Sequence, residues 1–267
     1  MATKNSNSVH DEALMTTGGH LEVLRQMLFR IIAVVLMIAA MVFCLKDTTW
    51  QVLMAPSEWN FCTYRWIEYV IQLIGVDFHF EEYHVNLIAT ELSSQFMTHI
   101  TTAVYLGMLG ASPYILYELF RFISPAFYDN ERSYSVKVTS VIYVLFVLGV
   151  LMSYFVLFPI SFRFLGTYSV STRVVSNITL DSYISTFISL TLVIGVVFQL
   201  PVIAFFLGKM DIITSSILAK YRKHSVLLLM LVSAIITPPD LMTLILVTIP
   251  LYVLYEISIR VLKMIGK

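Results

Sequence analysis

Long runs of apolar residues, separated by short polar stretches, cover most of this 267-residue chain. The runs lie near residues 28–45, 96–119, 138–162, 184–208, 226–236 and 241–255. A helix needs about 20 apolar residues to cross the hydrocarbon core of a bilayer. The pattern therefore predicts an all-α, polytopic membrane protein with six transmembrane helices.

Composition supports this class, and the positions of the basic residues give it an orientation. Hydrophobic residues make up 58% of the chain and charged residues 13%, whereas a soluble domain carries about twice that charged fraction. With the N-terminus inside, 13 of the 17 Lys and Arg residues face inside, as the positive-inside rule requires. Both termini are predicted to be cytoplasmic. The zero net charge hides this asymmetry, and no nucleic-acid partner is predicted.

The pattern divides the chain into helices and short connections. In order these are the cytoplasmic N-terminal segment (1–23), the first helix (24–45), a periplasmic loop with a short helix (46–95), the second helix (96–123), a cytoplasmic loop (124–137), the third helix (138–164), a periplasmic loop (165–182), the fourth helix (183–208), a cytoplasmic loop (209–225), the fifth helix (226–236), a periplasmic turn (237–240), the sixth helix (241–259) and the cytoplasmic tail (260–267).

The last two helices are predicted to be short. Their apolar parts, 226–236 and 241–255, span roughly 16 and 22 Å at about 1.5 Å per residue. The hydrocarbon core is about 30 Å thick. Between them, TPPD (237–240) leaves room only for a tight turn, because Pro cannot continue a helix with its hydrogen bonds intact.

The loop at 46–95 is the largest segment outside the membrane. Residues 66–76 place apolar side chains at helical spacing, which predicts a short amphipathic helix, either part of a folded cap or at the membrane interface. Cys44 and Cys62 flank the start of this loop. An oxidising compartment permits a disulfide between them, but spacing alone does not establish its geometry, and two unpaired thiols are the favoured interpretation.

Familiar catalytic patterns are absent. The chain has no HExxH, GxSxG or CxxC motif and no Gly-rich phosphate loop, which are typical of metalloproteases, hydrolases, redox proteins and nucleotide-binding proteins. The six His residues are scattered. The sequence therefore predicts neither a metal site nor another cofactor, and no enzyme.

Polar residues in or near the apolar runs are the candidate functional groups. Gln199 lies deep in the fourth helix, before Pro201. Its amide either bonds a neighbouring backbone or binds a partner, since intramembrane polar residues are often functional. Glu256, near the inner end of the sixth helix, either reaches the headgroups, pairs with Arg260, or serves a partner. Asp240, in the outer turn, is predicted to meet a polar group of a partner.

The segment FRFISPAFYDNER (120–132) forms the first inner loop and its flanks. Pro125 ends the second helix, and the aromatic residues lie at the depth where rings anchor at the membrane surface. The positive-inside rule concerns Lys and Arg, so it does not explain an acidic residue at position 131. Its carboxylate either receives a cationic peptide or pairs with a neighbouring Arg.

Seven short segments together resemble the TatC family, the polytopic core of the twin-arginine protein translocase. They are HLEVLR (20–25), SPYILYELFRFISPAFYDNER (112–132), YFVLFPISFRFL (154–165), DSYIS (181–185), FQLPV (198–202), TPPD (237–240) and IPLYVLYEI (249–257). The resemblance runs nearly end to end. It implies a receptor and scaffold for twin-arginine signal peptides of folded precursor proteins in the bacterial cytoplasmic (inner) membrane. Export would be driven by the proton-motive force.

The resemblance also implies partners and site residues. The partners are single-span TatA/TatB-type subunits, membrane lipid and further copies of the chain in a homo-oligomeric receptor complex. The residues that match the family's signal-peptide site are Arg25, Phe122, Pro125, Glu131 and Arg132.

Two positions depart from the family pattern. Val23 stands where the family has a Glu, and the acid is Glu22, turned by about 100° on a helix. We expect Glu22 to assist Glu131. Gln199 stands where the family has an intramembrane Glu. The change from Glu to Gln keeps the ability to form hydrogen bonds but removes a group that can titrate. Gln199, Asp240 and Glu256 are the predicted contacts with partner helices.

Two other functions were weighed against this one. A secondary transporter of a small solute requires several polar groups near the midplane, and only Gln199 is clearly central. A membrane-embedded enzyme requires a nucleophile–base pair or a metal site, and the sequence offers neither.

Overall fold

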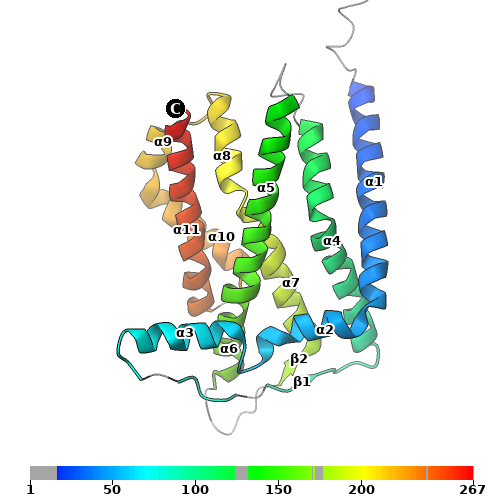
Figure 1. Cartoon of the computed structure of the whole chain (residues 1–267), viewed down its shortest axis with the longest axis vertical. Helices are drawn as coiled ribbons and strands as arrows, with labels where there is room; N and C mark the ends of the chain where they lie inside the picture. The colour runs from blue at the N-terminus through cyan, green and yellow to red at the C-terminus, as the bar shows by residue number, and fades with distance from the viewer. Residues whose placement is uncertain are drawn as a thin grey trace, which may run out of the picture.

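The computed structural model describes residues 17–77, 79–83, 85–123, 132–169, 171, 177–238 and 240–266, with the backbone alone at 17–20, 120, 123 and 132–137. Within these ranges the chain is a bundle of long helices (Figure 1). The start of α1 (Thr17–Cys44) and the end of α11 (Leu241–Met264) lie at one end of the bundle. We call this the terminal end and the opposite one the loop end.

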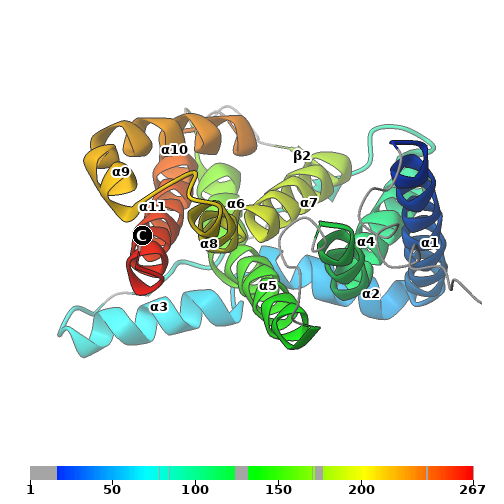
Figure 2. The ribbon, with the colours of Figure 1, turned by 90° about the horizontal axis from the view of Figure 1, so that it is seen from above.

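Five stretches of the described chain are long and apolar enough to cross a membrane: Leu21–Cys44, Ser94–Leu119, Val138–Thr167, Leu180–Lys209 and Leu241–Met264. Besides α1 and α11 they are built from α4 (Ser94–Ile123), α5 (Arg132–Met152), η3 (Ser153–Leu157), α6 (Phe158–Thr167), α7 (Leu180–Val197) and α8 (Leu200–Lys209). Figure 2 shows α1 and α4 at one edge of the bundle and α9, α10 and α11 at the other. The prediction of an all-α polytopic membrane protein is confirmed.

The fifth predicted helix is short, and the sixth is longer than its apolar part. A six-residue helix, α9 (Ser215–Lys220), precedes α10 (Arg222–Ile236), which has 15 residues, or about 22 Å. This is less than the roughly 30 Å of a hydrocarbon core. Helix α11 runs to Met264, five residues beyond the predicted end at 259.

Two of the spans are interrupted. The fourth span divides into α7 and α8 at Phe198 and Gln199, just before Pro201. Proline lacks a backbone N–H and clashes with the preceding turn, so the predicted single helix 183–208 is broken there. The third span contains the π-helical turn η3 between α5 and α6. Such turns insert one extra residue into a helix.

Short elements cover the loop end. Helix α2 (Lys46–Met54), the 3-10 turn η1 (Ala55–Ser57) and α3 (Cys62–Leu73) follow α1, and α2 and α3 lie across the end of the bundle (Figure 1). The amphipathic helix predicted at 66–76 is therefore present, four residues earlier. The two-residue strands β1 (Leu87–Ile88) and β2 (Ile178–Thr179) pair in parallel, which the helical pattern did not predict. Cys44 and Cys62 are free, exposed thiols.

Arg163 of α6 fixes this covering segment to the bundle. Its guanidinium carbon lies 5.1, 4.3 and 4.6 Å from the ring centres of Tyr64, Phe80 and Tyr83. Its Nη2 donates a hydrogen bond of 2.8 Å to the carbonyl of Glu81. Cations are attracted to aromatic faces at such distances. Burial raises the pKa of the Tyr64 hydroxyl, which donates to the carbonyl of Pro159 at 2.7 Å.

The core lies where the third and fourth spans meet α11. Its fully buried members include Leu157, Ile184 and Leu251. Helices α5 and α7 approach closely at Gly149, where an added Cβ would stand 2.9 Å from the Cα of Gly195. Residue 149 has no room for a side chain, so its glycine permits the close approach of the two spans.

Candidate functional site

Helices α1 and α4 pack closely against each other. At Gly107 an added Cβ would stand 2.9 Å from the carbonyl oxygen of Val35. Small residues allow helices in membranes to approach this closely. The first turns of α1 and the last turns of α4 both lie at the terminal end (Figure 1), and Arg30 of α1 contacts Glu118 of α4.

Glu22 and Arg25, both predicted site residues, pair with each other on α1. Nη2 of Arg25 lies 3.5 Å from Oε1 of Glu22, and both side chains are exposed. The same carboxylate oxygen accepts a hydrogen bond of 3.2 Å from Nε2 of Gln26. Exposed pairs of this kind are weak and easily exchanged for other partners.

A buried acid that the sequence analysis did not single out lies on α4. The Glu118 side chain is 7% exposed, and its Oε1 lies 3.4 Å from Nη1 of Arg30 on α1. The hydroxyl of Tyr114 donates to the same oxygen at 3.1 Å. The sequence does contain a signal for this residue. Glu118 is the one acid inside the apolar run 96–119, and intramembrane charges are rare.

The remaining predicted residues of this site are partly described. Phe122 lies half-buried in the last turn of α4, and Arg132 is the first residue of α5. Pro125 and Glu131 lie outside the described residues. Helix α4 ends and α5 begins at the terminal end (Figure 1), which is the end that also holds Glu22.

Gln199 lies at the break between α7 and α8. Its Nε2 donates a hydrogen bond of 3.1 Å to the carbonyl of Ile142 on α5. Its Oε1 is buried, and no described residue donates to it. The amide nitrogen is thus satisfied by the neighbouring helix, whereas the amide oxygen has no donor among the described residues.

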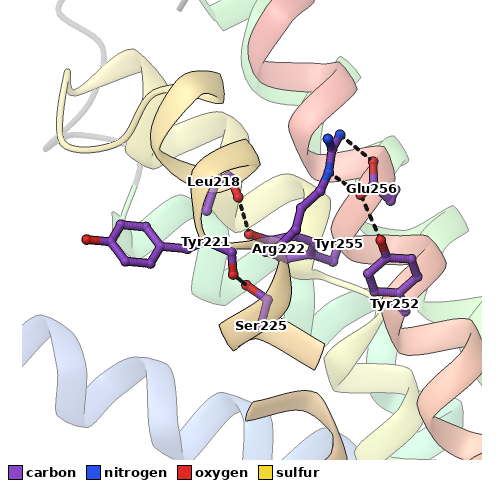
Figure 3. A network of polar contacts seen from close by, with 7 residues as sticks. All are labelled: Leu218, Tyr221, Arg222, Ser225, Tyr252, Tyr255 and Glu256. Atoms are coloured by element: carbon purple, nitrogen blue, oxygen red, sulfur yellow. Dashed lines mark hydrogen bonds and ion pairs between the residues drawn. The ribbon is translucent and has the colours of Figure 1, made fainter. Parts of the chain in front are cut away.

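Glu256 pairs with an Arg that is 34 residues away in the sequence (Figure 3). Its Oε1 and Oε2 accept hydrogen bonds of 2.6 and 3.0 Å from Nε and Nη2 of Arg222, and Tyr252 donates to Oε1 at 3.2 Å. The sequence left the headgroups or Arg260 as its structural partners. Arg222 of α10 takes that place instead, and both carboxylate oxygens are occupied.

Asp240 begins α11 at the loop end. Its Oδ1 accepts a hydrogen bond of 2.6 Å from the backbone N–H of Thr243, which caps the helix. The other oxygen, Oδ2, and the Thr243 hydroxyl are buried without a partner among the described residues. Leaving such groups unpaired costs roughly 1–3 kcal/mol each.

The comparisons with known proteins decide the family. A family model described as "Sec-independent protein translocase protein (TatC)" matches residues 19–250. The chain belongs to the TatC family.

Individual relatives agree over most of the chain. The TatC of Blattabacterium sp. subsp. Periplaneta americana is 32% identical over 256 residues, which are 93% of this chain and 95% of that protein. The TatCy of Bacillus subtilis is 37% identical over 183 residues, 68% and 72% of the two chains. A solved structure described as the crystal structure of the twin arginine translocase receptor TatC matches with a TM-score of 0.72, 29% identity and coverage of 93% of this chain and 100% of that one.

Membership in the TatC family makes this chain a multi-pass component of a Sec-independent protein translocase rather than an enzyme. The two other functions considered, a small-solute transporter and a membrane enzyme, are thereby set aside. Among the described residues no group of three or more His, Cys, Asp or Glu side chains could hold a metal ion.

Proposed function

We propose that this TatC chain is the receptor and scaffold for twin-arginine signal peptides, and that it exports folded proteins using the proton-motive force. The supporting observation is its likeness to a structure described as a twin arginine translocase receptor, over 93% of the chain at 29% identity. Further copies of the chain, membrane lipid and single-span TatA/TatB-type subunits complete the working complex in the bacterial inner membrane.

The terminal end is proposed to face the cytoplasm. Thirteen of the 17 Lys and Arg residues belong to the segments assigned to that side or to the ends of the helices next to them, and basic residues near span ends set orientation. Both termini are then cytoplasmic, and the loop end, with α2 and α3, faces the periplasm.

Impermeant thiol labelling tests this orientation. In the Cys44→Ser variant Cys62 is the remaining cysteine, and it is exposed at the loop end. A membrane-impermeant maleimide should label it in intact spheroplasts. The matched control adds Lys220→Cys to a cysteine-free chain and places an exposed thiol on α9. That thiol should react only after permeabilisation, and the opposite result would reverse the orientation.

The signal-peptide site is proposed at the terminal end, around Glu131 and Glu22, with Arg25, Phe122, Pro125 and Arg132 shaping it. A guanidinium forms bidentate hydrogen bonds with a carboxylate that an ammonium cannot copy. Two carboxylates for two arginines is the simplest match of charge. The exposed and weakly held Glu22 supports this role.

Photo-crosslinking of one signal peptide in Arg-Arg and Lys-Lys versions tests the function. The protein is purified in nanodiscs, and adducts are mapped by mass spectrometry. A receptor gives Arg-Arg adducts at the terminal end and few Lys-Lys adducts. Equal yields for the two peptides would remove the case for a twin-arginine receptor.

Partner helices are proposed to contact Asp240, Gln199 and Glu256. Asp240 and Gln199 each carry a buried oxygen that lacks a donor among the described residues, and a polar group on a partner's single helix would satisfy it. Glu256 has both oxygens occupied by Arg222. Its contribution is expected to be the placement of α10 against α11.

The dependence on the proton-motive force is tested by separating binding from export. An ionophore that collapses the force should stop export of an Arg-Arg reporter protein from cells. Binding of the signal peptide to the same membranes should persist. Export that continues after collapse would contradict this part of the proposal.

A further inference from the structure

Two Arg–Glu pairs join helices near the terminal end, and they differ in the number of hydrogen bonds between the two side chains. Arg222 and Glu256 form two hydrogen bonds of 2.6 and 3.0 Å through both carboxylate oxygens. Arg30 and Glu118 form one contact of 3.4 Å through Oε1 alone. We call the first pair closed, because both carboxylate oxygens are bonded. We call the second pair open, because one oxygen of its carboxylate has no hydrogen bond to any described residue.

The open pair is also uneven in burial. The Glu118 side chain is 7% exposed and the Arg30 side chain 49%. A carboxylate in such a place must keep a cation nearby, because an unpaired buried charge is costly. About half of the Arg30 side chain lies outside the protein interior, so its guanidinium can move away without becoming a second charge buried in the bundle. The carboxylate is therefore the fixed member of the pair and the arginine the exchangeable one.

From this geometry we propose that Glu118 is a second guanidinium-binding carboxylate of the signal-peptide site, and that Arg30 occupies it until a peptide arginine displaces it. The inference rests on the proposed receptor function. It supplies the acid that this chain lacks at Val23, where the residue is an exposed apolar side chain.

The position and surroundings of Glu118 suit this role. It lies one helical turn before Phe122, a residue of the proposed site, and near the terminal end of α4. Tyr114 donates to Oε1 at 3.1 Å and holds the carboxylate in place. An incoming guanidinium could form two parallel hydrogen bonds where Arg30 forms one, and bidentate pairs are the stronger kind. Exchange of one guanidinium for another keeps the carboxylate neutralised throughout.

A structural ion pair and an exchangeable one respond differently to mutation. If the pair only joins α1 to α4, Arg30→Gln and Glu118→Gln should weaken peptide binding alike. If Arg30 competes with the peptide, Glu118→Gln weakens binding, whereas Arg30→Gln removes the competitor and tightens it. Arg30→Lys keeps the charge beside Glu118 but forms a poorer contact, so it should tighten binding less than Arg30→Gln does.

Peptide titrations on the full chain in nanodiscs provide the test, with Arg-Arg, Lys-Arg and Arg-Lys versions of one synthetic signal peptide. We expect Glu118→Gln to weaken Arg-Arg binding about tenfold or more and to reduce the discrimination against one of the single-Lys peptides. Arg30→Gln should tighten Arg-Arg binding several-fold. Thermal melts verify folding, and if Glu118→Gln does not fold, the sign of the Arg30→Gln and Arg30→Lys effects decides.

Each other outcome overturns the inference. Parallel weakening by both variants would make the pair structural. Unchanged affinity in both, with Glu131→Gln still impaired, would leave the proposed receptor function intact and remove Glu118 from the site. A wild-type chain that binds Arg-Arg and Lys-Lys peptides equally would instead refute the receptor function itself.

Discussion

Arg222 and Glu256, 34 residues apart, join α10 to α11 through two hydrogen bonds of 2.6 and 3.0 Å. Helix α10 has 15 residues, so it depends on its neighbours for its position. Near its other end, the Thr248 hydroxyl of α11 donates to the Ser233 hydroxyl at 3.0 Å. The short helix is thus tied to α11 at two levels.

Removing either member of the Arg222–Glu256 pair should loosen α10. We expect Arg222→Gln and Glu256→Gln each to lower the melting temperature of the purified protein by about 2–4 °C. The double variant should be little worse than either single variant, because both remove the same interaction. Arg260→Gln is the matched control, since Arg260 lies one turn from Glu256, whose hydrogen bonds within the described part of the chain come from Arg222 and Tyr252. A larger loss in that control would show that Arg260 is the important partner.

Glu131→Gln should sharply weaken binding of an Arg-Arg peptide while leaving the fold intact. Removing one partner of a desolvated charge pair costs about 2–5 kcal/mol, or a loss of affinity of more than about tenfold. The change removes the charge and keeps the size and the hydrogen-bonding oxygen. Isothermal titration with the Arg-Arg peptide, with a Lys-Lys peptide as the matched probe, measures it. Unaltered affinity would place the site elsewhere.

Glu22→Gln should have a much smaller effect. The Glu22 carboxylate is exposed and shared between Arg25 and Gln26, and exposed ion pairs contribute about 0.2–1 kcal/mol. We therefore expect a loss of less than about fivefold in Arg-Arg peptide affinity, with export of a reporter slowed rather than abolished. A loss as large as that of Glu131→Gln would make Glu22 the full replacement for the acid missing at Val23.

Gln199→Met tests whether the unpaired amide oxygen serves a partner. The change forfeits the bond to the Ile142 carbonyl but also removes the buried Oε1 that lacks a donor among the described residues. These two effects are each about 1 kcal/mol or more and opposite in sign, so the melting temperature should change little. Crosslinking of a single-span partner to α8 should decrease. A stable variant with undiminished crosslinking would make Gln199 purely structural.

Gly149→Ala should destabilise the crossing of α5 and α7. The added methyl group would stand 2.9 Å from the Cα of Gly195 and 3.0 Å from the Ile194 carbonyl oxygen. Backbone atoms cannot move aside as a side chain can, and such overpacking costs about 1–3 kcal/mol. Gly110→Ala is the control, because its new methyl group would meet only the Ile38 side chain, at 3.1 Å. Equal melting temperatures for the two variants would contradict a tight α5–α7 crossing.

The spans could be predicted because membrane-crossing helices leave long apolar runs, and runs such as 138–162 mark them directly. Pro201 alone signalled the break of the helix at Gln199. The apolar run around Gln199 indicated how deep in the membrane this residue lies. The arginine partners of Glu256 and Glu118 could not be predicted, because they lie far away in the sequence. Glu256 meets Arg222, and Glu118 meets Arg30 across 88 residues. Only the packing of whole helices determines such pairs.

The π-helical turn η3 divides the third span into two halves that are out of phase. Its extra residue turns everything after Leu157 by about 100° relative to an uninterrupted α-helix. The turn also presents the carbonyl of Phe155 to the hydroxyl of Thr63 on α3. If the same residues continued as an unbroken α-helix, Arg163 would be rotated away from the three rings that it contacts. The covering of the loop end thus depends on the number of residues in one helical turn as much as on their identity.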